Sequence, residues 1–481
     1  MGTWSVEFNN IPHAASDARQ DIDEFIRGRV AAYSTGLPPA GEVFYFPPGD
    51  HVFVLGTDEV FDIPEQIELR FAPGARLIAV GDGASLVLHG ALVAPIAPIF
   101  ATAATVDVHS LPGPLAAAIP FGPKIEQIHP EWWGAGTLAG RSPESLRSEE
   151  VNLIAEADSA ALQSAFHAAI YGEALSSESG AISPRGPVVD LVGTYVVRRP
   201  IYLGPATIDV SKQALPPLSP SPLEVRGRFC DPVQVTFWCA PDFDASTGAS
   251  MFVVYDLPGL LLHCVSFESS DHEVSCVGAA AIVTPPAKST RLPYVFRHCR
   301  FRSRGDVTRH RVALVRIDVL GVSLDVGMPV VEFEGCVFEP SKTLGAAVRL
   351  SSMNRLSGAT FRGCTFAGHA MAMVDALGFS LSTTGCRFEN QAIPPRIDMA
   401  SRRLSDKELA SMHEVAPEGG VDVYLRQNPV DMDPSTDERP KASFPPVVVP
   451  GELSAISFSA QDCRSTSPQF LVAPSPSARP D

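Results

Sequence analysis

Hydrophobic and polar residues follow two periods along this chain, and the two periods return in the same order. Residues 17–33 carry apolar side chains at helical spacing behind the polar residue Ser16, and residues 158–171 repeat that spacing. Short apolar runs broken by Gly and Pro follow each segment, beginning with 41–53 and 186–197. The pattern predicts a helix followed by short strands, twice, and thus an internally duplicated N-terminal unit.

A finer repeat takes over from about residue 250. The motif F-x-x-C-x-F occupies 296–301, 333–338 and 361–366, and its C-x-F end returns at 386–388. Successive strand residues face opposite sides, so a first Phe and a Cys three positions later share a face only if the strand bends between them. Units this short cannot bury an apolar face alone. We therefore expect a solenoid in which Phe stacks on Phe and Cys on Cys; unrelated hairpins that reuse C-x-F are the alternative.

Changes of pattern divide the chain into six parts. We predict an N-terminal helix with a first strand unit, a Trp-containing joint and loop, a helix cap with the main solenoid, a lateral insertion, a last coil and a disordered tail. In that order they cover residues 1–127, 128–157, 158–393, 394–446, 447–472 and 473–481. The insertion contains a capping-box helix start at Ser405 with Glu408.

The net charge of the chain limits the classes of binding partner that we expect. With 37 Lys and Arg against 54 Asp and Glu, the formal charge of −17 repels phosphate backbones and anionic lipids. Nucleic acid and membrane are therefore not expected partners, and an acidic polysaccharide could bind only through a local basic patch. The N-terminus lacks a signal-peptide pattern and no run of about 18 apolar residues occurs, so we expect a soluble chain. Its location is cytoplasmic by default, unless a non-classical route exports it.

The nine cysteines form no C-x-x-C pair. Their odd number and spacing indicate neither a complete disulfide framework nor a zinc knuckle. Reduced, buried thiols are the simpler expectation. No cofactor is required by the sequence, and a metal site stays unknown.

Several segments resemble one family. They are "IHPEWWGAG" (128–136), "EADSAALQSAFHAAI" (156–170), "GPVVDLVGTYVV" (186–197) and the C-x-F coils. Together they resemble the pectate-lyase-like superfamily of right-handed parallel β-helices, which includes polysaccharide-degrading phage tailspikes. The resemblance implies an all-β, right-handed parallel β-helix with short capping helices, and a polysaccharide as partner. Asp158-Ser159 and Leu191-Val192 depart from the family's usual residues there.

Two adjacent tryptophans, Trp132 and Trp133, allow two interpretations. They could form a stacking platform for a sugar ring, or a packed joint between structural pieces. The resemblance favours the joint, because the corresponding family segment leads into the helix that closes the solenoid.

A candidate site comes from aligning three runs, "ALVRID" (313–318), "AAVRLS" (346–351) and "AMVDAL" (372–377). The alignment puts Arg316, Arg349 and Asp375 in one outward column. Their preceding valines point inward. Parallel strands lie about 4.8 Å apart, so the column could hold an acidic sugar, and we predict these three as catalytic residues. The alternative is a neutralising ladder of surface charges.

Other polar groups favour a structural role. Arg297, Glu334 and Arg362 form a second column whose alternating signs suit mutual pairing. His369 could act as an acid or base, and the run Asp271-His272-Glu273 could bind a metal, but both are more typical of solvated turn and loop residues.

Two functions remain open. The first is a polysaccharide lyase or glycoside hydrolase, with Ca²⁺ as a cofactor if it is a lyase. The catalytic signatures of the polygalacturonase-like hydrolases and of the classical pectate and pectin lyases are absent from the sequence. The second is therefore a non-catalytic structural or binding β-helix, fibre-like or particle-associated, which could assemble as a homotrimer.

Overall fold

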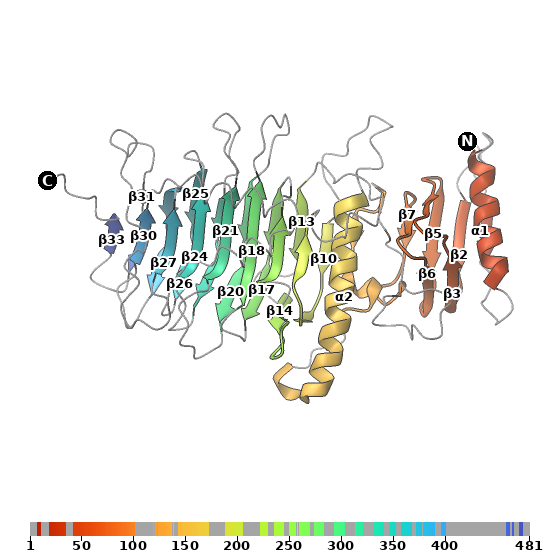
Figure 1. Ribbon diagram of the computed structural model, residues 1–481, viewed down its shortest axis with the longest axis horizontal. Helices are drawn as coiled ribbons and strands as arrows, with labels where there is room; N and C mark the ends of the chain where they lie inside the picture. The colour runs from red at the N-terminus through yellow and green to blue at the C-terminus, as the bar shows by residue number, and fades with distance from the viewer. Residues whose placement is uncertain are drawn as a thin grey trace. The chain divides into compact units, whose positions relative to one another are not determined.

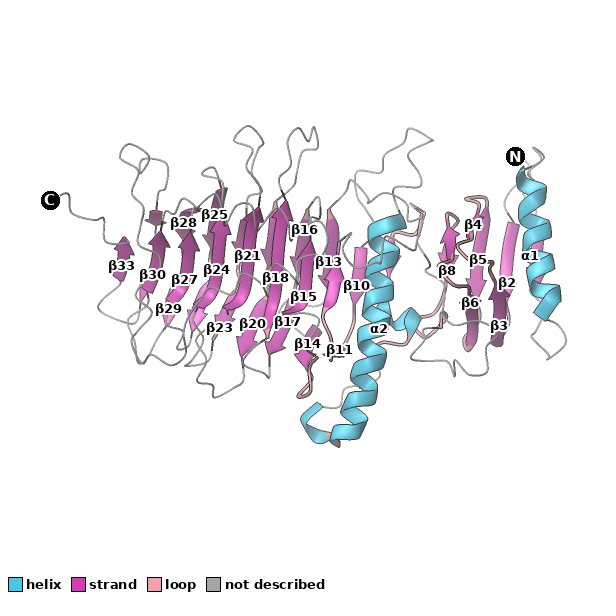
Figure 2. Cartoon of the chain, viewed as in Figure 1, coloured by secondary structure: helices cyan, strands magenta, loops and turns pink. Residues whose placement is uncertain are grey.

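The structure is a computed structural model of the chain. It describes residues 7–10, 19–34, 42–101, 119, 121–122, 124–136, 138, 143–172, 188–204, 222–228, 235–244, 250–255, 257, 259–269, 274–282, 293–303, 313–320, 331–340, 346–352, 357–367, 372–377, 379–389, 396–400, 458–461, 464–465 and 471–474. The chain divides into two compact units, Met1–Leu191 with Ile208–Glu224, and Val192–Thr207 with Val225–Asp481. Strands dominate the described residues, which contain only two α-helices (Figure 2).

The first unit contains both α-helices and ten strands among its described residues. Its elements are β1 (Glu7–Asn10), α1 (Arg19–Ser34), β2 (Glu42–Phe46), β3 (Gly49–Val54), β4 (Val60–Ile63), β5 (Ile67–Phe71), β6 (Ala75–Val80), β7 (Ser85–Leu88), β8 (Leu92–Val93), β9 (Gln127–Ile128), the 3₁₀ helices η2 (Pro130–Trp133) and η3 (Pro143–Ser145), α2 (Ser148–Gly172) and β10 (Val188–Leu191). The predicted helix at 17–33 is confirmed by α1.

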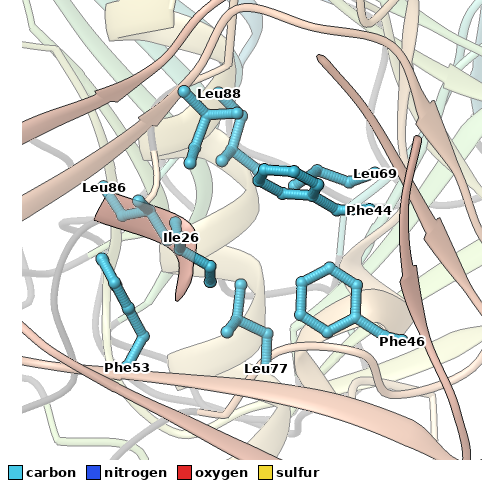
Figure 3. A pocket seen from close by; sticks show the side chains of 9 residues that line it. Ile26, Phe44, Phe46, Phe53, Leu69, Leu77, Leu86 and Leu88 are labelled. Atoms are coloured by element: carbon cyan, nitrogen blue, oxygen red, sulfur yellow. The ribbon is translucent and has the colours of Figure 1, made fainter. Parts of the chain in front are cut away.

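From β2 to β8, consecutive strands of the first unit go to different sheets, and all pairings of its described strands are parallel. The sheets run β1-β2-β5-β8, β3-β6 and β4-β7. Figure 3 shows apolar side chains from these sheets and from α1 pointing into one interior space. They are Ile26, Phe44, Phe46, Phe53, Leu69, Leu77, Leu86 and Leu88. All eight are buried, so this space is the unit's core rather than a binding site.

Helix α1 is fixed to the strands by two ion pairs. The Arg27 guanidinium donates to both carboxylate oxygens of Glu59, at 2.5 and 3.0 Å. It also lies over the rings of Phe53 and Phe61, 5.3 and 4.9 Å from their centroids. The Arg29 Nε donates to the buried Glu42 carboxylate at 2.6 Å. Polar residues of the predicted amphipathic helix, as well as its apolar ones, therefore contact the strands.

The second unit is built almost entirely of short strands. They are β11 (Thr194–Val197), β12 (Ile201–Leu203), β13 (Leu223–Gly227), β14 (Val235–Cys239), β15 (Ser250–Tyr255), β16 (Leu260–His263), β17 (Val265–Ser269), β18 (Ser275–Ile282), β19 (Tyr294–Arg297), β20 (Arg300–Ser303), β21 (Ala313–Leu320), β22 (Val331–Glu334), β23 (Val337–Glu339), β24 (Ala346–Ser352), β25 (Ser357–Arg362), β26 (Thr365–Ala367), β27 (Ala372–Leu377), β28 (Phe379–Thr384), β29 (Arg387–Glu389), β30 (Arg396–Ala400), β31 (Phe458–Gln461), β32 (Arg464–Ser465) and β33 (Leu471–Pro474).

Every third strand belongs to the same sheet. The first sheet contains β13, β16, β19, β22, β25, β28 and β31; the second contains β11, β14, β17, β20, β23, β26, β29 and β32; the third contains β12, β15, β18, β21, β24, β27, β30 and β33. All pairings between the described strands are parallel, and in Figure 1 the strands of the third sheet follow one another in chain order. We call three consecutive strands, one per sheet, a rung. Stacked rungs of this kind are compatible with a parallel β-helix.

The F-x-x-C-x-F motif spans the corner between the first and second sheets, as the predicted bend requires. Its first Phe is the next-to-last residue of a first-sheet strand, and its second Phe lies on the next second-sheet strand. The residue before each cysteine takes a positive φ of 50° to 64°; these residues are His298, Gly335, Gly363 and Gly385. This left-handed turn brings Phe, Cys and Phe all to the interior, where they are buried.

Register turns the repeated motif into columns of like residues. Phe296, Phe333 and Phe361 stack with centroids 4.8 Å apart at each step. In the second sheet a longer column stacks at 4.8 to 5.5 Å and comprises Tyr195, Phe237, Phe267, Phe301, Phe338 and Phe366. The predicted Phe-on-Phe stacking is confirmed.

The cysteines form a parallel column. Cys336, Cys364 and Cys386 each donate a weak Sγ–H hydrogen bond, 3.2 to 3.4 Å long, to the carbonyl of a Phe one rung earlier. Burial in this apolar interior raises the pKa of the Cys336 thiol, so it remains protonated. Six described cysteines are free and buried, as expected. Cys264 differs, because it is disulfide-bonded.

Three predicted boundaries differ from the structure. Helix α2 begins at Ser148 rather than at Asp158, because Glu149 and Glu150 stabilise an earlier first turn through the helix dipole. Asp158 is instead buried inside the helix, where its carboxylate accepts a hydrogen bond from the Gly136 amide at 2.9 Å.

At the other end of the chain, strand β30 (Arg396–Ala400) occupies part of the predicted insertion and pairs with β27. Strand β33 extends to Pro474, into the predicted tail. The rest of the insertion, with the helix start at Ser405, lies outside the described residues.

Candidate functional site

The three predicted catalytic residues occupy one register position on adjacent strands of the third sheet. Arg316 of β21 pairs with Arg349 of β24, which pairs with Asp375 of β27. One residue earlier, Val315, Val348 and Val374 form the matching inward column, and all three are buried. The alignment of the three runs therefore corresponds to the strand pairing.

A fourth group, Asp318, belongs to this site and was missed by the sequence analysis. It lies two residues after Arg316 on β21, hence on the same face, and its Oδ2 accepts a hydrogen bond from Arg316 Nε at 2.7 Å. Opposite charges two apart on a predicted strand, as in "VRID", are the sequence signal that could have identified it. Together, Arg316 and Asp318 form an ion pair along one strand beside the Arg349 guanidinium.

The site is more enclosed than an open surface column. The side chain of Asp318 is 2% exposed and that of Arg316 17%, and Arg349 as a residue is 7% exposed. Next to these residues, on the same face of the sheet, lies a register column of Met251, Cys276, Leu314 and Ala347, all buried. The described part of the third sheet around Arg316 and Arg349 is therefore buried on both faces, so these two arginines are less exposed than the alternative of a surface ladder of charges predicts.

Burial and the two arginines act on Asp318 in opposite directions. Burial raises the pKa of its carboxyl and is the larger effect, whereas Arg316 and Arg349 lower it. A carboxyl with a raised pKa next to guanidinium groups is a feature of proton-transferring sites, and equally of internal ion-pair networks. The Asp318 carboxyl could therefore either transfer a proton or hold the arginines in a structural ion-pair network.

The second predicted column lies on the first sheet and contains one ion pair among its three residues. Arg297, Glu334 and Arg362 are successive register partners. The Arg297 Nε lies 3.0 Å from the Glu334 carboxylate, and both side chains are nearly half exposed. The predicted structural role of this column is supported at that pair.

Trp132 and Trp133 are packed inside the first unit. They are 5% and 2% exposed. The Trp132 indole Nε1 donates to the Pro95 carbonyl at 3.0 Å, and the Trp133 ring lies 5.1 Å from Phe100 and 5.6 Å from Phe121. A buried indole cannot stack on a sugar ring, so the platform interpretation is wrong and the packed joint is supported.

The remaining candidates from the sequence add no functional residue among those that the structure describes. His369 and the run Asp271-His272-Glu273 lie outside the described residues. Within the described ranges, no group of three or more His, Cys, Asp and Glu side chains is placed to hold a metal ion. None of the helices in those ranges is both long enough and apolar enough to span a bilayer.

Comparison with known proteins identifies no relative. No family model, curated protein or solved structure matches the chain. The resemblance to the pectate-lyase-like superfamily therefore rests on the sequence motifs, and the order of the parallel strands is consistent with it.

Proposed function

We propose that the protein is a right-handed parallel β-helix that binds an acidic polysaccharide and cleaves it, as a lyase or a glycoside hydrolase. The observation that carries this proposal is the in-register placement of Arg316, Arg349 and Asp375, with Asp318 beside them. Guanidinium groups on adjacent strands, about 4.8 Å apart, match the carboxylate of a uronic acid. The recurrence of a helix followed by parallel strands supports the internal duplication as part of the same proposal.

The residues suit two reactions. In β-elimination, one of Arg316 and Arg349 would accept the proton from the carbon next to the sugar carboxylate while the glycosidic bond breaks and its oxygen leaves. The other arginine would neutralise the carboxylate, and Ca²⁺ could assist in that role. In hydrolysis, Asp318 and Asp375 would supply the two carboxyl groups, with the raised pKa of Asp318 suiting a general acid. The products differ, because only β-elimination leaves an unsaturated sugar at the new end.

The experiment is a cleavage screen over acidic and neutral polysaccharides, with and without Ca²⁺. It measures new reducing ends and the ultraviolet absorbance of unsaturated products. Arg349→Lys and Asp375→Asn should lower turnover by about a hundredfold or more if these groups act in the reaction. Arg302→Gln, which removes an exposed charge from another sheet, is the matched control and should retain full activity.

A second candidate is a non-catalytic binding or structural β-helix. The burial of Arg349 and Asp318 favours it, because a network closed to solvent can hold the third sheet together without meeting a ligand. Polysaccharide binding without cleavage in any metal condition would support this candidate. Light scattering on the purified chain tests the homotrimer that such a component could form. Absence of both binding and cleavage over the whole panel would overturn the first proposal.

A further inference from the structure

On the rungs that precede β25, arginines of the first and second sheets form ion pairs with acidic residues. Arg297 lies 3.0 Å from Glu334, and Arg300 donates to both Glu339 oxygens at 2.9 and 3.0 Å. Arg302 also contacts Glu339, at 3.7 Å. The outer surface of rungs β19–β21 and β22–β24 is therefore close to neutral along this corner.

Two arginines on the following rungs differ. Arg362 of β25 and Arg387 of β29 are exposed, and neither side chain has a hydrogen-bond or ion-pair partner among the described residues. Register places Arg362 beside Thr384 in the first sheet, and Thr365 beside Arg387 in the second. Each of the two rungs, about 4.8 Å apart, thus places one arginine and one threonine at this corner, and the order of the two is reversed from one rung to the next.

Among the described residues, no side chain covers the corner between these four residues. Gly363 and Gly385 form it, with φ of +60° and +64°, and no heavy atom of the described part of the chain lies within 4 Å of where a Cβ would stand on either. One rung earlier the same corner is covered, because a Cβ on Gly335 would meet the His298 ring at 2.6 Å. Two successive open glycines therefore leave a notch with exposed backbone between the arginines.

The chemistry of the notch suits an oxyanion. A guanidinium binds a carboxylate or sulfate through two parallel N–H bonds, and a threonine hydroxyl can donate another. The nearest acids only partly oppose this charge: Glu334 is held by Arg297, and Glu389 follows Arg387 by two residues on the same strand face. On a chain with a formal charge of −17, this is the kind of local basic patch that an acidic polymer needs.

We propose that this notch, bordered by Arg362, Thr365, Thr384 and Arg387, binds a carboxylate or sulfate group of an acidic polysaccharide. The class of polymer rests on the function proposed above. The site itself is separate from it, because Arg316 and Arg349 belong to the third sheet. It would hold the polymer without taking part in cleavage.

The test measures calorimetric binding of polygalacturonate, dextran sulfate and neutral dextran to the full chain. The double variant Arg362→Gln/Arg387→Gln should lose at least about tenfold in affinity for one acidic polymer. Thr384→Val, which changes no charge, should lose about threefold. Arg302→Gln, which removes one guanidinium outside the notch, is the control and should bind like the parent, because Glu339 keeps its contacts with Arg300. Equal thermal unfolding of all variants ensures that binding is compared between folded proteins.

The outcomes distinguish the type of anion that the notch binds, and they separate failure of the notch from failure of the proposed third-sheet site. Loss for polygalacturonate alone assigns a carboxylate, and loss for dextran sulfate alone assigns a sulfate. An equal loss in Arg302→Gln, an unchanged double variant or equal binding of neutral dextran would overturn the notch. If Arg349→Lys abolishes cleavage while the double variant binds normally, the notch fails and the proposed function stands. If no acidic polymer binds the parent, both fail.

Discussion

Arg316 and Asp318 form an ion pair along one strand, with Nε and Oδ2 2.7 Å apart and the carboxylate almost wholly buried. In-strand pairs at this spacing are common on protein surfaces, where they contribute little. Here the desolvation of Asp318 makes the partner important, because an uncompensated buried carboxylate is costly.

Replacing the arginine tests this relation. Arg316→Gln should destabilise the protein by about 3 kcal/mol at neutral pH, because Asp318 loses a group that lowers its pKa. The carboxyl then has a folded pKa further above its unfolded value, so the lost stability should return as the pH falls and Asp318 becomes protonated. Denaturant unfolding at several pH values measures it. The double variant Arg316→Gln/Asp318→Asn should be less affected; a pH-independent loss in Arg316→Gln would contradict the account.

The Arg27–Glu59 contact predicts an acid-sensitive first unit. The hydrogen bond from Arg27 lowers the pKa of Glu59 below its ordinary 4.5, against the opposing effect of burial. A depressed carboxyl pKa stabilises the fold above the unfolded pKa, and that stability is lost as the pH falls through the folded pKa. Glu59→Gln should therefore be less stable than the parent at neutral pH and should lose less stability on acidification. Parallel pH-dependent melting curves would refute this.

The aromatic columns should dominate the stability of the second unit. Phe333 is fully buried and stacks on Phe296 and Phe361. Phe333→Ala should cost about 3–5 kcal/mol, since it removes both stacking contacts and leaves a cavity. Phe333→Leu should cost less, and Val93→Ala, at an exposed position, should cost little. Chemical denaturation compares the three, and a loss under about 1 kcal/mol in Phe333→Ala would show that the column contributes little.

The buried tryptophans give a prediction that separates stability from binding. Trp132→Phe removes the hydrogen bond to the Pro95 carbonyl and should cost about 1 kcal/mol while leaving polysaccharide affinity unchanged. Calorimetry with an acidic polysaccharide and thermal unfolding measure the two quantities. A variant that kept its stability but lost affinity would restore the sugar-platform interpretation.

The columns could be predicted from sequence because in-register parallel pairing turns a repeated motif into a line of neighbours. One alignment of C-x-F coils was therefore enough to place Phe on Phe, and Arg316 beside Arg349. The stacking requires no knowledge of the turns, only that each rung returns to the same register.

What escaped prediction depends on burial and on contacts between distant residues. Asp318 resembles any strand-surface acid until its 2% exposure is known. The early start of α2 was missed because its first turn is stabilised by Glu149 and Glu150 rather than by an apolar pattern. The disulfide of Cys264 depends on a spatial neighbour that spacing does not reveal.

The first-sheet aromatic column ends where Thr383 takes the register position after Phe361. Thr383 is buried, yet it has no ring to stack on its neighbour. The column also begins inside the sheet, because Leu262 holds the register position before Phe296. In a stack whose stability is a sum of nearest-neighbour terms, the three rungs that carry these rings then adhere more strongly in the first sheet than the rungs on either side. These three rungs would act as an internal kernel, from which the flanking rungs would separate first on unfolding.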